Sequence, residues 1–78
     1  MLNKMPTPHI QSILFDRSKW TIPKAEAWLI NHKKRLIKVD KTKNKLRFRQ
    51  RTPNKMRYRY ITKKIPRGIE LIIGYSRY

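Results

Sequence analysis

Cysteine is absent from this 78-residue sequence, and acidic side chains are few. Without cysteine the chain forms no disulfide, and its two histidines are too few to hold a structural zinc ion. Glycine occurs only at positions 68 and 74, so the glycine-rich loop that cradles nucleotide phosphates is missing as well. The sequence therefore predicts neither a metal nor another cofactor, and the lack of cysteine fits a reducing compartment.

Long hydrophobic runs are also missing. The apolar run LIIGY near the end is far shorter than the roughly 20 residues that span a bilayer, so no membrane insertion is expected. The N-terminal segment lacks the continuous apolar stretch of a secretory signal, which favours an intracellular or virion-internal protein. We expect residues 1–9 to form a flexible lead-in and residues 10–76 a single basic domain. A domain of this size buries only about 60% of its unfolded surface, which allows little more than one helix on one sheet.

Positive charge is what the sequence has in excess. Lysine and arginine number 21 against 4 acidic residues, giving a formal net charge of +17 and a pI near 11.1. Such an excess repels itself in the folded state and is most easily explained by a polyanionic partner. Nucleic acid is the first candidate, an anionic membrane surface the second, and an acidic protein the third.

Hydrophobic periodicity predicts an α+β fold in the order β-α-β-β-β-β. Thr21 is a suitable N-cap and Pro23 is tolerated in a first helical turn, so a helix is expected over residues 22–33, with an apolar stripe that includes Trp28 and Leu29. Period-two alternation and turn residues predict an antiparallel sheet whose strands cover residues 10–16, 36–40, 45–50, 55–61 and 69–75.

Two of these strands, 45–50 and 55–61, alternate arginines with apolar side chains and are expected to pair with each other. Alternation would turn one set of side chains toward the helix as core, namely Leu46, Phe48, Met56, Tyr58 and Tyr60. The opposite face would then carry Arg47, Arg49, Arg51, Arg57 and Arg59. No acid occurs between residues 41 and 69, and like charges opposite one another destabilise a sheet, so this face predicts an anionic partner.

The predicted function is nucleic-acid binding through phosphate contacts. Arginine suits this task because its planar fork binds pairs of phosphate oxygens. Since the aromatics are assigned to the core, duplex DNA is favoured over single strands and little sequence preference is expected, while RNA as the partner and a homodimer stay open. Lysines at the helix end and in the turns would form a broader field. The candidate binding residues are Arg47, Arg49, Arg51, Arg57, Arg59, Lys45, Lys55 and Lys63.

Catalytic groups are sparse. His9 falls in the expected lead-in, His32 at the helix end, and the four acids are too scattered for a paired-carboxylate site. We therefore predict that the protein is not an enzyme. Two alternatives stay open: a structural virion protein whose positive face binds an acidic protein, and a small basic ribonuclease that uses arginine, lysine and tyrosine.

The segments KWTIPKAEAWLINHKKRLIKVDKTKNKLRFRQ and GIELIIGY resemble small basic proteins encoded by large double-stranded DNA viruses of the Marseillevirus and Mimivirus type. A related pattern, with a K-W-T start, an A-x-x-W-L helix and an L-R-F-R-Q strand, occurs in some tailed-phage proteins. The resemblance covers about residues 15–75 and is mostly structural, with Arg47, Arg49 and Gln50 as its polar signature. It implies a virion or viral-factory protein bound to the genome, and it supplies no catalytic residue.

Overall fold

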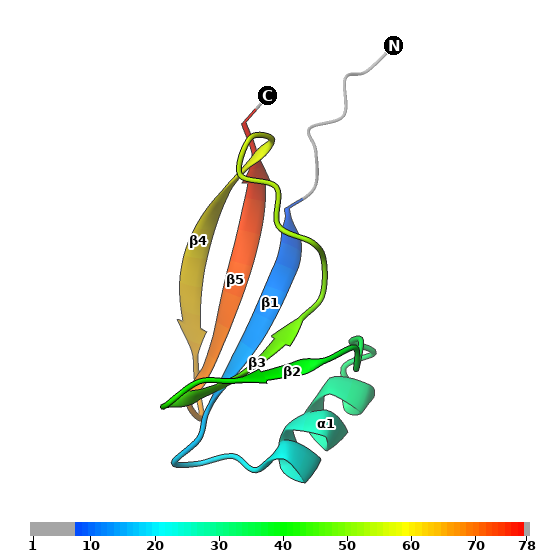
Figure 1. Cartoon of the computed structure of the whole chain (residues 1–78), viewed down its shortest axis with the longest axis vertical. Coiled ribbons are helices and arrows are strands. Elements are labelled where there is room, and N and C mark those ends of the chain that lie inside the picture. Colours follow the sequence, from blue (N-terminus) through cyan, green and yellow to red (C-terminus); the bar gives the residue numbers. More distant parts are fainter. Residues whose placement is uncertain (1–7, 78) are drawn as a thin grey trace.

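The computed structural model describes residues 8–77, which form one α-helix and a five-stranded antiparallel sheet (Figure 1). The α+β class and the element order β-α-β-β-β-β are as the sequence predicts. Residues 1–7 of the predicted lead-in (1–9) lie outside the described residues. His9, which was also assigned to the lead-in, begins the first strand. The elements are β1 (His9–Asp16), α1 (Ile22–Asn31), β2 (Val39–Lys41), β3 (Lys45–Arg49), β4 (Tyr58–Ile65) and β5 (Ile69–Ser76).

The strand order across the sheet is β2-β3-β1-β5-β4, so β1 is central and β4 lies at an edge. β1 pairs with β3 on one side and with β5 on the other, and the register shifts between Ile10 and Ser12 at a bulge. The most apolar strands, β1 and β5, thus occupy interior positions, while β4 places its lysines at an edge, where charge discourages unwanted pairing.

Helix α1 begins where the sequence predicts and ends slightly earlier. The Thr21 side chain accepts a hydrogen bond from the Lys24 amide (3.4 Å), and Pro23 lies in the first turn, where its missing N–H costs nothing. The helix ends at Asn31, two residues earlier than predicted. Lys33 then adopts a left-handed conformation (φ 57°), and the Lys34 amide donates back to the Leu29 carbonyl (2.8 Å). This reversal turns the chain toward the sheet at a run of three cations.

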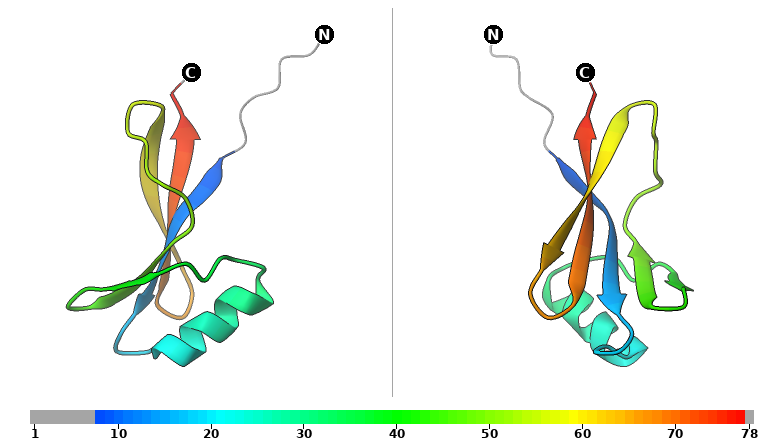
Figure 2. Two further views of the ribbon diagram at one scale, coloured as in Figure 1. Left: turned by 45° about the vertical axis from the view of Figure 1, so that its right-hand side comes forward. Right: turned by 90° about the vertical axis from the view of Figure 1, so that its left-hand side faces the viewer.

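The hydrophobic core lies between α1 and one end of the sheet. Its buried members are Ile13, Phe15, Ala25, Leu29, Leu46, Phe48 and Ile69. Phe15 is at its centre, in edge-on contact with the rings of Trp20, Trp28 and Phe48 at centroid distances of 4.9, 5.6 and 5.6 Å. Figures 1 and 2 show that the far ends of β4 and β5 extend beyond the helix, so the helix covers only part of the sheet.

The predicted pairing of residues 45–50 with 55–61 is wrong, because β1 and β5 lie between β3 and β4. Residues 50–57 do not form a tight turn. They connect the end of β3 to the start of β4 and cross the sheet on the way (Figure 2). Near β1 the Gln50 and Arg51 amides donate to the Gln11 carbonyl, and near β4 the Asn54 amide donates to the Tyr60 hydroxyl. This crossing separates two arginine-rich strands that would repel each other if paired.

The predicted core is right for β3 and wrong for β4. Directly paired residues of antiparallel strands point to the same side of the sheet, so Leu46 and Phe48 share the helix side with Phe15 and Ile13. On β4 the phase is opposite: Tyr58 and Tyr60 pair with Ser76 and Gly74 on the outer side of the sheet, away from the helix. Met56 precedes β4 and is 83% exposed.

Candidate nucleic-acid interface

The five arginines predicted to share one face lie in three places. Arg47 and Arg49 are on the outer side of β3, whereas Arg59, which pairs with Tyr75, is on the helix side of β4. Arg51 and Arg57 lie outside the strands, in the 50–57 crossing. The expected flat arginine face is therefore not formed, because β3 and β4 are not neighbours and have opposite phases.

Arg47 is held within the fold. Its Nε donates to the Ser12 hydroxyl and its Nη2 to the Gln11 side-chain carbonyl, both at 3.2 Å. Gln11 and Ser12 are fully buried polar residues, and the Ser12 hydroxyl also donates to the Gln11 side chain (2.7 Å). These bonds use part of the five-donor guanidinium to satisfy buried oxygens, so Arg47 stabilises the sheet where the bulge interrupts β1.

Ion pairs occupy two further candidates on the outer side. Lys45 lies 3.2 Å from Glu70 across β1, and Arg49 lies 3.9 Å from Asp40. Both pairs keep some solvent contact, so each contributes little to stability. Among residues 8–77 these are the ion pairs present, which leaves most of the positive charge without an acidic neighbour.

The remaining candidates surround β4. Arg59 lies over the Tyr75 ring, 5.9 Å from its centroid, and Lys63 is exposed on the same side of the strand. The carbonyls of Lys55 and Arg57 accept hydrogen bonds from Arg77, while their own side chains are exposed. These cations form a dispersed field along the edge of the sheet.

A basic groove is the main concave feature of the described surface. It consists of a cavity of about 780 Å³ and a smaller one of about 360 Å³, which share the lining residues Arg35, Gln50, Arg51 and Thr52. The larger cavity is also lined by Pro8, His9, Ile10, Lys33 and Lys34, and the smaller by Ile37, Lys38, Asp40 and Arg49. Six cations thus line the groove against one acid, Asp40.

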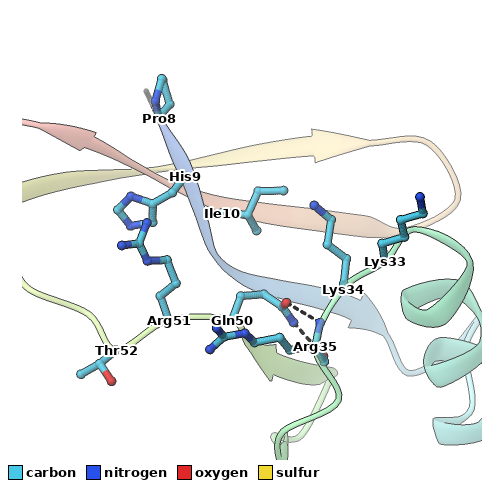
Figure 3. Close-up of a pocket in the computed structure, with 9 residues that line it drawn as sticks. All are labelled: Pro8, His9, Ile10, Lys33, Lys34, Arg35, Gln50, Arg51 and Thr52. Atoms are coloured by element: carbon cyan, nitrogen blue, oxygen red, sulfur yellow. Dashed lines mark hydrogen bonds between the residues drawn. The ribbon is translucent and has the colours of Figure 1, made fainter. Parts of the chain in front are cut away.

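Gln50 joins the two walls of this groove. Its side-chain carbonyl accepts from the Arg35 amide (2.8 Å) and its NH₂ donates to the Arg35 carbonyl (3.0 Å), as the dashed lines in Figure 3 show. The amide therefore satisfies both backbone groups of one residue and ties the segment after the helix to the end of β3. This contact brings Lys33, Lys34 and Lys38 to the same groove as Arg51.

His9 lies where the larger cavity meets the outer side of the sheet. Its ring contacts Tyr58 edge-on at a centroid distance of 4.6 Å and Tyr60 at 6.4 Å, and the Arg51 side chain reaches toward it (Figure 3). Burial first and the Arg51 charge second lower the pKa of His9 below its ordinary value of 6.5, which favours the neutral ring. The tyrosines assigned to the core thus pack against His9 instead.

Sequence reasoning identified two of the groove cations, Arg49 and Arg51, as binding residues. It placed the lysines of the helix end in a diffuse field and assigned His9 to the lead-in, and it gave Gln50 only a place in the polar signature. The usable signal was the run of cations at residues 33–35 directly after the helix. What the sequence did not reveal was which strand end this run would face.

Comparison with known proteins gives no match to a protein family, a curated protein or a solved structure. In the part of the chain that the structure describes, no helix is long and apolar enough to cross a membrane. Within residues 8–77 there is also no cluster of three or more potential metal ligands.

Proposed function

We propose that this protein binds nucleic acid, with duplex DNA as the preferred form, through contacts between its cations and the phosphate backbone. Such contacts position a protein on the duplex without reading bases, so little sequence preference is expected. The resemblance to small basic viral proteins extends this proposal to a genome in a virion or viral factory. The role is binding and not catalysis.

The observation that carries the proposal is the basic groove. Six cations from two chain segments converge there with one acidic neighbour, and the Gln50–Arg35 hydrogen bonds hold the two segments together. Cations gathered in a concavity with so few acids raise the local potential more than the same charges spread over a convex surface. A polyanion with closely spaced charges is the ligand that lowers this repulsion most.

The test is a salt titration of binding to two unrelated duplexes. Each neutralised phosphate releases counterion, so log K should fall with log salt at a slope of about −0.9 per contact. The two duplexes should give similar affinities at every salt concentration. A weak salt dependence, or tight binding to an acidic protein with none to DNA, would instead favour the structural-protein alternative.

A matched pair of double variants locates the contact surface. Arg49→Gln with Arg51→Gln removes two charges from the groove, while Arg59→Gln with Lys63→Gln removes two from the helix side of β4. The groove variant should weaken binding to both duplexes and reduce the salt slope by about one per lost contact. The β4 variant should have a smaller effect, because its charges lie outside the groove. Equal effects of the two variants would show that the groove is not the contact surface.

A further inference from the structure

Strand β4 is the long open edge of the sheet. Among the described residues β4 pairs with β5 alone, so alternate backbone groups along Tyr58–Ile65 point away from the sheet. The other edge strand, β2, has three residues, whereas β4 has eight. Edge strands are usually protected by a bulge, a proline, a covering segment or charge. The pairing of β4 with β5 has no bulge and the strand contains no proline, so exposed charged side chains protect this edge.

The charge of this edge is positive on both sides of the sheet. Arg59 and Lys63 lie on the helix side and Lys64 on the outer side, and all three are exposed. None of them takes part in the two ion pairs found within residues 8–77. Together with the net charge of +17, these cations oppose pairing with a second copy of the chain. They favour a strand with acidic side chains, because opposite charges on paired strands attract each other.

An apolar row crosses the sheet and ends at the same edge. Ile10, Ile73 and Ile61 pair in turn across β1, β5 and β4, so their side chains share the helix side. Helix α1 covers only part of this side (Figure 2), and Ile61 is 47% exposed. Ile61 lies between Arg59 and Lys63 on the same face of β4. The helix side of this edge therefore presents a cation, an apolar residue and a second cation at alternate positions.

We propose that β4 binds an extended acidic segment of a partner protein, which adds to the five-stranded sheet as a further strand. Main-chain hydrogen bonds to the open edge supply affinity, and alternate side chains supply selectivity. The segment that fits carries an apolar residue opposite Ile61 and acidic residues opposite Arg59 and Lys63. This pattern is the same in both directions, so a parallel or an antiparallel strand satisfies it. Such a protein is a partner in addition to the proposed nucleic acid and occupies a different surface.

The experiment measures binding of a labelled peptide to the full chain by fluorescence anisotropy. The peptide is as long as β4 and has the central sequence Glu-Thr-Val-Thr-Glu, and its control has lysine in place of both glutamates. At about 0.15 M salt, charges more than about 8 Å apart are largely screened, and the acidic peptide alone should bind. Hydrogen exchange should then slow at alternate amides of Tyr58–Ile65, because an added strand bonds only to the outward groups.

A methylated form of the acidic peptide separates strand addition from general attraction between charges. Methylation of every backbone amide keeps both glutamates and the valine but removes the donors that an added strand needs. This form should bind at least about tenfold more weakly, because several hydrogen bonds to the edge are lost. Equal binding of the methylated and unmethylated forms would show that charge alone holds the peptide, and it would overturn the proposal.

A charge-matched pair of protein variants places the site. Arg59→Gln with Lys63→Gln and Arg49→Gln with Arg51→Gln each remove two positive charges, and only the first pair lies on β4. The β4 variant should bind the acidic peptide about tenfold more weakly, the order of effect of losing two cross-strand ion pairs. The groove variant should bind the peptide like the parent, and equal weakening in both variants would overturn the β4 site. Failure of the parent to bind the peptide would also overturn it while leaving DNA binding intact, so the two proposals fail separately.

Discussion

Gly74→Ala should destabilise the protein even though the change adds a methyl group to a strand. Gly74 pairs with His9 on one side and Tyr60 on the other, and an added Cβ would lie 2.8 Å from ring atoms of both. Replacing a glycine in a strand interior by alanine ordinarily raises the free energy of unfolding by about 0.5–1 kcal/mol. Overpacking lowers it by about 1–3 kcal/mol. The two rings also pack near each other, so neither can move away freely, and the clash should prevail by about 1–2 kcal/mol.

The assay is thermal unfolding followed by circular dichroism above pH 7, where His9 is neutral. A loss of about 1–2 kcal/mol lowers the Tm of a domain this size by about 4–16 °C. In a His9→Ala background the same change should cost less, because one of the two clashing rings is gone, and the difference measures their coupling. A Gly74→Ala protein that melts at or above the parent temperature would refute the packing described for His9 and Tyr60.

Three further predictions concern single residues. Arg47→Gln should lower the free energy of unfolding by about 1–3 kcal/mol, because buried oxygens lose their charged donor. The matched variant Arg59→Gln should change the free energy of unfolding by less than about 0.5 kcal/mol, and urea unfolding of both proteins measures the difference. Trp28→Ala should cost about 2–3 kcal/mol in the same assay, less than a fully buried aromatic, because the ring that contacts Phe15 is only half-buried. The pKa of His9 is lowered in the folded state, so the contribution of neutral His9 to stability is present above pH 6.5 and is lost as pH falls through the folded-state pKa. His9→Gln should therefore flatten the dependence of Tm on pH in this acidic range.

The fold class could be predicted because each element carries its own signal. Thr21 and Pro23 mark the start of the helix, and Leu46 and Phe48 alternate with arginines on a strand that has one buried face. These signals are local, since they depend only on neighbouring residues. Local patterns of this kind determine whether a segment is a helix or a strand, and they identify its core-facing side where only one side is apolar.

The phase of β4 could not be predicted from its alternation alone, because either set of side chains could face the core. A shift of one residue exchanges the two faces, and here the β4–β5 hairpin decides between them. Ile65 pairs with Ile69 on the helix side, so counting back from Ile65 places Arg59 on that side and Tyr60 on the other. The correct anchor was the turn at residues 66–68, where Arg67 and Gly68 adopt positive φ values.

The basic groove could not be predicted because its walls are brought together by non-local pairing. Arg35 and Gln50 are fifteen residues apart and meet only because β3 ends beside the bulge of β1. The cations were evident from composition, and nothing in their spacing showed which would converge. Charge therefore indicated the kind of partner, while strand order determined the place where such a partner can be held.

The central position of β1 has a consequence for how this protein acquires its structure. β1 pairs with β5, joining His9 to Gly74 and Phe15 to Ile69, so the sheet cannot close until residues 69–76 have been synthesised. Contacts between residues so distant in sequence slow folding, because the chain loses loop entropy before they form. Until β5 arrives, one edge of β1 stays without its partner strand. A nascent or truncated chain that ends before residue 69 should therefore be prone to aggregation and proteolysis, even though its helix and β2–β3 hairpin are complete.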